Sequence, residues 1–287
     1  MLRSRAGKVY LARTKRDRSP CAHKMIVARI RTSGMEAQVL REIRTQRAAM
    51  HEHVLRQFAH FANESQVCLV LEHAPGGDLH TRLVANGGRG LAHASAALIT
   101  RQLSAGVAYC HAMRIIHRDI KAENIFFALA GGVKLGDFGW AIQSARRRQT
   151  YCGTLEYLAP EMAAGNTYDA AVDTWSIDVV LFEMLTGFTP FEAGAVPFEA
   201  GAVPRADATD ERRRFRAEVH GRITAASVAF PSACTASKAT RGLTLQLLDK
   251  DASQRKVGDV DAHPWIVAEA LKASPYVFRD GDEEPIR

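Results

Sequence analysis

The sequence predicts an α+β fold of two lobes: a small lobe with an antiparallel sheet and one main helix, then a larger, mainly helical lobe. Residues 8–12 (KVYLA) and 67–73 (VCLVLEH) have the β-branched and apolar composition of strands. Residues 35–50, between them, are rich in helix formers and contain no Pro or Gly. The break at Pro75-Gly76-Gly77 separates these elements from the helical patterns that follow.

The larger lobe is predicted from two segments, 98–114 and 171–186, in which apolar residues return at helical spacing and mark a buried face. These residues are Leu103, Val107, Cys110 and Met113 in the first segment and Val172, Trp175, Val179 and Phe182 in the second. Gly187 and Pro190 end the second helix.

We place the small lobe at 1–72, the larger lobe at 73–266 and a C-terminal tail at 267–287. The heptapeptide FEAGAVP at 191–197 is repeated at 198–204. Because each copy contains Gly, Pro and small residues, the pair predicts an extended loop inserted in the larger lobe rather than a solenoid.

Composition narrows the class of protein. The chain of 287 residues is 47% hydrophobic and 24% charged, which excludes wholesale disorder. Its net charge of +7 is spread along the sequence, so we interpret it as a solvated basic surface and expect no direct binding of nucleic acid. Five scattered cysteines, no apolar run of membrane length and no secretory leader predict an intracellular protein of the cytoplasm or nucleus.

One predicted hairpin brings oxygen-bearing side chains together. Ile125–Phe127 and Val133–Leu135 flank a Gly-Gly turn, so Asn124 at the start of the hairpin lies beside Asp137 at its end. Carboxylate and amide oxygens are the ligands that Mg²⁺ takes when substrate phosphates complete its shell.

Asp119 lies five residues before Asn124, close enough to accept a proton from a hydroxyl near such a metal, and Lys121 can offset phosphate charge. From the hairpin alone, a structural role and a catalytic role explain these residues about equally well.

Three motifs in order, HRDIKAEN at 117–124, DFG at 137–139 and APE at 159–161, resemble the eukaryotic protein kinases. More narrowly, DFGW and the run RRRQTYCGTLEYLAPEM at 146–162 are similar to the Aurora kinases, and HPWI at 263–266 and Gln46 agree with this. The resemblance, which covers about Gly7 to Trp265, implies a bilobal protein kinase fold and a Ser/Thr protein kinase that transfers the γ-phosphate of ATP.

The resemblance also implies the catalytic roles. Asp119 would orient or deprotonate the substrate hydroxyl, and Lys121 would stabilise the transferring phosphoryl group. Asn124 and Asp137 would hold Mg²⁺ on the ATP phosphates.

The lysine that contacts the nucleotide phosphates would be Lys24, paired with Glu42. A competing register through residues 27–30 (VARI) would put Ile30 at this position, but the interval from Val9 to Lys24 suits the family spacing. The other implied ATP-binding residues are Gly7 in the phosphate-covering loop, Val9, Ala22 and Phe126 around the adenine, Leu71, Glu72 and Ala74 in the hinge between the lobes, and Glu123.

Thr150 is the implied regulatory phosphosite, because a phosphate there carries a charge of about −2 and Arg118 can bind it. Arg147-Arg148 precedes it. We therefore hypothesise self-phosphorylation by a kinase that prefers Arg before its target, with Glu123 and Asp78 as acidic residues that bind such arginines.

Three further features are expected to be structural. Glu161 and Arg255 would form a buried ion pair, and Asp173 with Trp175 would anchor the catalytic loop. His117 would be a packed core residue rather than a proton shuttle.

The phosphate-covering loop departs from the family pattern G-x-G-x-x-G-x-V. Leu2 and Ser4 stand where its first two glycines belong, and the strand ahead of them is missing, so the chain start is truncated or nucleotide is held without a full lid. Asp178 replaces a glycine and places a charge in the central helix, and Ala122 replaces a proline.

These departures leave open a second class, a pseudokinase scaffold with impaired nucleotide binding. The intact functional set argues against it: Lys24, Glu42, Asp119, Asn124 and Asp137. A small-molecule kinase is disfavoured by the APE motif and the Thr150 loop. The expected partners are protein substrates with Arg before the Ser/Thr and an activating protein. A role in the cell cycle, with spindle or chromosome association, follows from the resemblance alone.

Overall fold

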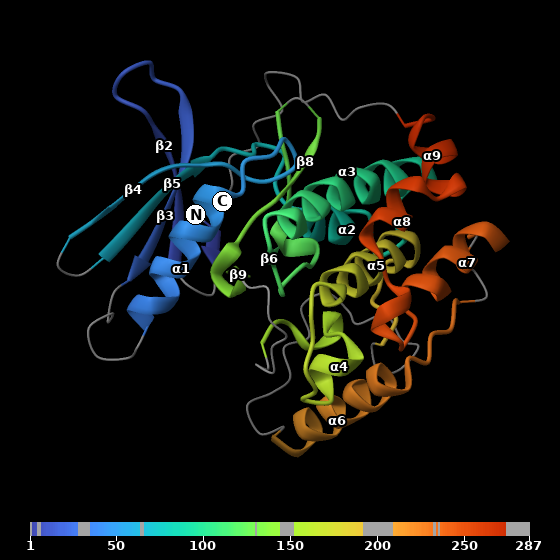
Figure 1. Ribbon diagram of the computed structural model, residues 1–287. Helices are drawn as coiled ribbons and strands as arrows, with labels where there is room; N and C mark the ends of the chain where they lie inside the picture. Colours follow the sequence, from blue (N-terminus) through green and yellow to red (C-terminus); the bar gives the residue numbers. More distant parts are fainter. Residues whose placement is uncertain are drawn as a thin grey trace.

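The computed structural model describes residues 2–4, 7–27, 35–63, 66–129, 131–143, 152–191, 209–231, 234 and 236–273, and it has the two predicted lobes (Figure 1). The small lobe is an antiparallel sheet in the order β1-β2-β3-β5-β4, with helix α1 packed against it. Its elements are β1 (Leu2–Ser4), β2 (Gly7–Arg13), β3 (Pro20–Val27), α1 (Met35–Ala48), β4 (Gln57–Ala62) and β5 (Gln66–Glu72).

Strand register places three site residues on one face of this sheet. Val9 lies opposite Lys24, and Lys24 lies opposite Leu69. Directly opposite residues share a face, and so do residues two apart on one strand, which adds Ala22 to this face. The register therefore aligns Lys24 with Val9, which agrees with the spacing used to prefer Lys24 over the VARI register.

The segment at which the first two glycines of the family pattern would stand has extended backbone. Leu2–Ser4 forms a short strand, with Leu2 opposite Val9 and Ser4 opposite Gly7. Backbone pairing with β2 does not need the glycines that the family pattern has at Leu2 and Ser4, since any residue adopts extended backbone.

The larger lobe is mainly helical and shares one extensive hydrophobic core. Its helices are α2 (Leu79–Ala85), α3 (His93–Ala112), α4 (Pro160–Ala163), α5 (Ala171–Thr186), α6 (Thr209–Ala225), α7 (Lys238–Leu247), α8 (Val257–Ala262) and α9 (Pro264–Ala270). Its short strands are β6 (Ile115–Ile116), β7 (Ile125–Phe127), β8 (Val133–Leu135) and β9 (Ile142–Gln143), and they pair as β6-β9 and β7-β8.

Helix α5 runs through the middle of this lobe and is buried on all sides from Val172 to Thr186, not on one face only. Its predicted bounds, 171–186, agree with the structure. For α3 the prediction was less accurate: the helix begins at His93 and ends at Ala112, so Met113 lies past its end and is 40% exposed instead of buried.

The structure bears on two predicted segments: the duplicated heptapeptides and the C-terminal tail. The description stops at Phe191, which stacks on Trp175 with ring centroids 5.4 Å apart, so the rest of the duplicated heptapeptides lies outside the described residues. A tail beginning at residue 267 would cut through α9, which continues to Ala270 because Ile266 and Ala270 are both buried in the core.

Glycines hold the loop after α2 against the end of α5. Gly187 caps α5 with φ of 90°, and a Cβ on it would lie 1.9 Å from the carbonyl oxygen of Gly88. A Cβ on Gly90 would lie 2.7 Å from the carbonyl oxygen of Leu185. Side chains at these two positions are excluded by backbone contact.

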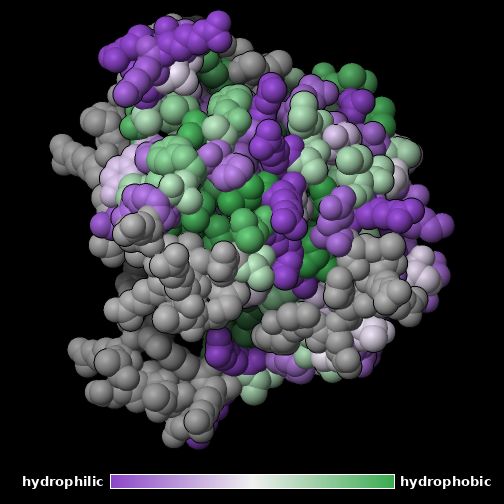
Figure 2. Space-filling model, turned by 60° about the vertical axis from the view of Figure 1, so that its left-hand side comes forward, coloured by the Kyte–Doolittle hydropathy of each residue, from purple (hydrophilic) through white to green (hydrophobic). Residues whose placement is uncertain are grey.

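Three further properties of the described structure concern membrane helices, the cysteines and one face of the surface. Within the described residues, no helix is both long and apolar enough to cross a bilayer. All five cysteines are free thiols. On the face drawn in Figure 2, hydrophobic atoms gather near the middle and a band of hydrophilic atoms crosses them, so this face is neither uniformly charged nor uniformly apolar.

Candidate active site

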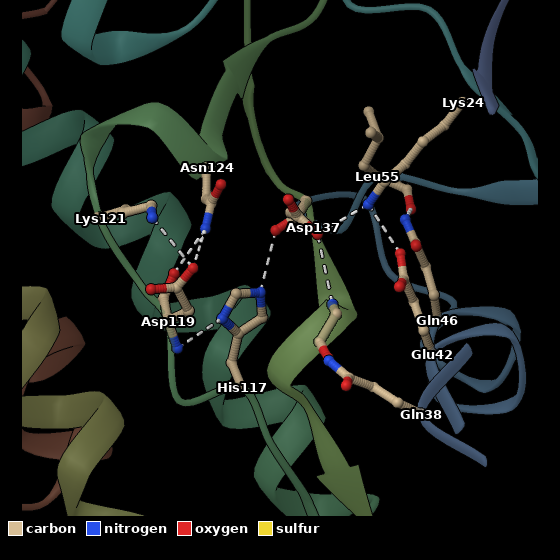
Figure 3. A network of polar contacts seen from close by, with 12 residues as sticks. Lys24, Gln38, Glu42, Gln46, Leu55, His117, Asp119, Lys121, Asn124 and Asp137 are labelled. Atoms are coloured by element: carbon tan, nitrogen blue, oxygen red, sulfur yellow. Dashed lines mark hydrogen bonds and ion pairs between the residues drawn. The ribbon is translucent and has the colours of Figure 1, made fainter. Parts of the chain in front are cut away.

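The predicted hairpin is present. β7 and β8 pair with Ile125 opposite Leu135, and the amide of Gly136 donates to the carbonyl of Asn124 at 2.9 Å. Asn124 thus precedes one strand and Asp137 follows the other, at the same end of the hairpin (Figure 3).

Asp119 is held by three neighbours. Its Oδ2 lies 3.1 Å from Lys121 Nζ and accepts a hydrogen bond from Asn124 Nδ2 at 3.2 Å. Its Oδ1 accepts from Thr154 Oγ1 at 3.2 Å, and Lys121 donates to the same Thr154 oxygen at 2.8 Å. Because Thr154 is 35 residues from Asp119, the loop motif alone gave no signal for it.

Lys24 bridges the two lobes. Its Nζ lies 2.8 Å from Glu42 on α1 and 2.8 Å from Asp137 in the larger lobe (Figure 3). Burial alone would lower the pKa of Lys24, but the two carboxylates outweigh burial and raise its pKa. Burial would likewise raise the pKa of Asp137, and the charge of Lys24 reverses this, so the Asp137 pKa is lowered. Lys24 and Asp137 are therefore both kept charged.

The turn after β8 is held by helix α1. Asp137 has a left-handed backbone with φ of 55°, and its Oδ1 accepts from the amide of Gly139 at 3.4 Å. Gln38 on α1 donates to the carbonyl of Gly139 at 3.1 Å. Gln46, one turn beyond Glu42, donates to the carbonyl of Leu55 at 3.1 Å. The sequence marked Gln46 but not Gln38, whose partner is 101 residues away.

The loop that carries Asp119 is anchored from α5. Asp173 accepts from the amides of His117 and Arg118, each at 2.8 Å, and from His111 Nε2 at 2.9 Å. This confirms the expected anchor for Asp173. The ring nitrogen of Trp175 has no hydrogen-bond partner among the described residues, and the ring packs on Phe191.

His117 is a packed residue, as expected. It is 1% exposed, its Nε2 donates to the carbonyl of Gly136 at 3.0 Å, and its ring meets Phe138 edge-on at 4.8 Å. The expected ion pair of Glu161 and Arg255 is also present, at 2.7 Å.

Asp178 differs from the expected charge in the central helix. It is fully buried, and neither carboxylate oxygen has a hydrogen-bond partner among the described residues. Burial without a partner raises its pKa well above the ordinary value, because an unpaired charge is costly to bury. The buried acid thus favours its neutral form.

Residues expected around the adenine come together in one apolar cluster. Ala22, Ala74 and Phe126 are partly buried and pack against a core that includes Leu71. A Cβ on Gly136 would lie 2.8 Å from the Phe126 ring, so the absence of a side chain at Gly136 leaves room for that ring.

Glu72 of the expected hinge makes contacts within the small lobe and with the larger lobe. Its side chain accepts from the amide of Arg56 at 3.2 Å and pairs with Lys134 on β8 at 2.8 Å. Its backbone amide donates to the carbonyl of Arg56 at 2.8 Å.

Some expected site residues lie outside the described part of the chain. Thr150 and Arg147-Arg148 lie outside the described residues, and only the backbone of Gly7 is described. Of the acidic residues assigned to substrate arginines, Glu123 is exposed, and Asp78 caps α2 and accepts from the amide of Thr81 at 2.7 Å. Asp78 also forms a β-bridge with Phe126, three residues after Glu123.

The remaining donor atoms suit a hard cation. Asn124 uses its amide nitrogen on the carbonyl of Asp119 at 2.7 Å, which leaves its amide oxygen available. Asp137 engages Lys24 through Oδ1, and its Oδ2 has no hydrogen bond to another described residue. One amide oxygen and one carboxylate oxygen are ligands that Mg²⁺ accepts.

Comparisons with known proteins agree with this geometry. The protein kinase domain family matches residues 4–266. Aurora kinase C of Mus musculus is 35% identical over 276 residues, which cover 95% of this chain and 91% of that protein. Serine/threonine-protein kinase Aurora-2 of Arabidopsis thaliana is 35% identical, covering 96% and 90%. Aurora kinase B of Mus musculus is 34% identical, covering 94% and 72%. The chain therefore belongs to the protein kinase family, as an Aurora-like serine/threonine protein kinase.

Proposed function

We propose that this kinase transfers the γ-phosphate of ATP, bound with Mg²⁺, to Ser or Thr residues that follow arginine in protein substrates. As a protein kinase, the chain uses ATP and a divalent metal ion. The observation that carries the assignment of its residues is the Lys24–Asp137 contact of 2.8 Å, which joins the phosphate-binding lysine to the metal-binding carboxylate.

Asp119 acts on the substrate hydroxyl in this proposal. Lys121 and Thr154 orient its carboxylate, so a hydroxyl placed against it is oriented for attack and can transfer its proton. Lys121, 12% exposed, also faces the transferring phosphoryl group with its charge.

Asn124 and Asp137 hold the metal through the two oxygens that have no partner among the described residues. When bound, Mg²⁺ neutralises charge on the phosphates. Asp137 presents its oxygen in a fixed direction, because Lys24 and the Gly139 amide occupy the other one.

The nucleotide is held between the lobes. We assign the phosphates to Lys24, supported by Glu42, and to the Gly7 backbone. The adenine is assigned to an apolar slot and to hinge backbone groups, formed by Val9, Ala22, Phe126, Leu71, Glu72 and Ala74. The same assignment puts the lobe boundary between residues 72 and 73.

A preference for arginine before the acceptor is supported by acidic groups beside the catalytic loop. Glu123 is exposed next to the turn that carries Asn124. Tyr157 donates to Glu183 at 2.6 Å, and burial first, then Glu183 and Glu123, raise the Tyr157 pKa. Both carboxylates therefore lie near the Tyr157 ring, and Glu123, the exposed one, is the one that a substrate guanidinium can reach. Asp78 is a further acidic residue.

The test is phosphorylation of a peptide Arg-Arg-Ala-Ser with labelled ATP. Wild type should transfer phosphate, and D119N should lower kcat by about 100-fold or more. E123A should raise KM for this peptide more than for one with alanines in place of both arginines. Equal KM changes for the two peptides would contradict the arginine preference, and full activity of D119N would contradict the role of Asp119.

Thr150 is proposed as a self-phosphorylation site with Arg118 as the phosphate-binding residue. Arg118 now donates to the carbonyl of Trp140 and to the Tyr168 hydroxyl, both at 2.8 Å, so its guanidinium is already held beside the catalytic loop. Mass spectrometry of wild type and D119N protein tests this. We expect phosphate on Thr150 only in wild type, and equal phosphate in both would refute it.

We further propose that the protein works inside the cell, in the cytoplasm or nucleus, with an activating protein partner. The five free cysteines support a reducing compartment.

A further inference from the structure

A cavity of about 270 Å³ lies between the segment that follows Thr154 and helix α6. It is lined by Leu155, in the 3₁₀ turn Leu155–Tyr157, and by three residues of α6: Arg216, Ala217 and His220. None of the residues assigned to ATP or Mg²⁺ lines it.

The cavity is close to the point of phosphoryl transfer. Thr154 donates to Asp119 at 3.2 Å, and Leu155 is the next residue along the chain. An extended peptide advances about 3.3–3.6 Å per residue. A substrate whose hydroxyl lies against Asp119 therefore reaches this cavity with a side chain roughly two to four residues away.

The direction of the substrate follows from the proposed function, on which this inference rests. Arginines before the acceptor are assigned to Glu123 and to Asp78, the residue that caps α2. Figure 1 shows α6 at the bottom of the larger lobe, well separated from α2. Residues after the acceptor therefore run toward α6.

The charge of the cavity sets the chemistry of its occupant. Arg216 is exposed and has no hydrogen bond or ion pair with another described residue, in contrast to Arg222, which pairs with Glu218 at 2.7 Å. His220 is fixed in place, because its Nε2 donates to the carbonyl of Ala163 at 2.8 Å. Leu155 and Ala217 supply apolar walls for the stem of a side chain.

We propose that this cavity is a substrate subsite for an Asp or Glu side chain that follows the acceptor, and that Arg216 is the residue that binds its carboxylate. An arginine guanidinium beside apolar walls matches an acidic side chain with a short aliphatic stem. The kinase would then select substrates by arginine before the acceptor and by acid after it.

Peptides test the subsite. The reference peptide is Arg-Arg-Ala-Ser followed by four alanines, and four others each carry one Glu in those positions. For wild type we expect kcat/KM to be about 2- to 5-fold higher for Glu at one or two of the second to fourth positions, the range of a solvent-exposed ion pair. R216A should bring this ratio to 1, and R216E should bring it below 1.

The matched control is R214A, because Arg214 is exposed on the same helix but does not line the cavity. It should keep the wild-type ratio. Since the ratio is taken within each variant, loss of folded enzyme lowers both values and leaves it unchanged. A wild-type ratio of 1 at every position, or a ratio unchanged in R216A, would overturn the inference. Failure of wild type on all five peptides would instead overturn the arginine preference, and the inference with it.

Discussion

Phe126 and Gly136 form a size-matched pair at the residue scale. A Cβ on Gly136 would lie 2.8 Å from the Phe126 ring and 3.2 Å from Leu55, so G136A must displace the ring toward the proposed adenine position. We expect KM for ATP to rise at least about 5-fold, because overpacking of this kind costs about 1–3 kcal/mol and 1.4 kcal/mol is a factor of 10.

The double variant G136A/F126L should recover most of the lost ATP affinity, because leucine leaves the space that the new methyl group needs. Steady-state kinetics at varied ATP measure this. Additive losses in the double variant would show that Phe126 does not transmit the effect.

Asp178 gives a prediction about pH. Its pKa is raised in the folded protein. The contribution of the Asp178 side chain to the free energy of unfolding is therefore largest below its unfolded pKa of about 3.9, and it is lost as pH rises toward the folded pKa. D178G removes this term. We expect D178G to raise the Tm at pH 7 by several degrees and to flatten the dependence of Tm on pH between 5 and 7. A lower Tm at pH 7 for D178G would mean that Asp178 has a partner that stabilises it.

Sequence reasoning reached the site residues that lie in short motifs and missed those that act across the fold. Asp119, Asn124 and Asp137 are recognisable because their spacing is local. Gln38 and Thr154 are not, because each meets its partner only after distant segments fold together.

At the scale of the element, the loop carrying Asp119 depends on α5. Arg118 has a left-handed backbone with φ of 67°, and its amide and that of His117 both bind Asp173. D173N keeps the shape but removes the charge that three donors share. We expect a loss of about 3 kcal/mol in the free energy of unfolding and a lower kcat.

Denaturant unfolding and steady-state kinetics measure these two effects. D169N is the control: Asp169 is exposed, and the one described hydrogen bond of its side chain is from the amide of Ala171 at 3.0 Å. That variant should lose less than about 1 kcal/mol. Equal losses in the two variants would contradict the anchoring role of Asp173.

Periodicity predicted the existence of the helices better than their surroundings. For α5 the bounds agree, yet the helix is buried on every side, which a three-to-four residue pattern does not reveal. For α3 the pattern ran one residue too far, since Met113 is apolar but lies beyond the last turn.

At the scale of the whole molecule, two ion pairs join the lobes. Lys24 meets Asp137, and Lys134 on β8 meets Glu72 at the end of β5. The bilobal arrangement was predictable from the Pro75-Gly76-Gly77 break, whereas these cross-lobe contacts join residues more than 60 positions apart and left no local pattern.

Ligand binding across these lobes should stabilise the whole protein. ATP with Mg²⁺ at 100 times its Kd adds about 2.7 kcal/mol, which raises Tm by several degrees. D137N should lose the part of this shift that needs Mg²⁺ and keep a smaller shift with ATP alone. Thermal denaturation with and without Mg²⁺ measures both, and a Mg²⁺-dependent shift that survives in D137N would contradict the metal assignment.

Contact between the backbone of Gly187 and that of Gly88 limits which substitutions this sequence can accept. In a saturation library, Gly187 and Gly90 should accept no replacement, because any Cβ meets a carbonyl. Gly87 and Gly165 have φ of +67° and +71° with nothing within 4 Å of a Cβ, so Asn and Asp should survive there at a cost of about 1 kcal/mol. Two glycines are therefore irreplaceable for lack of volume, and two are merely preferred for their torsion angle.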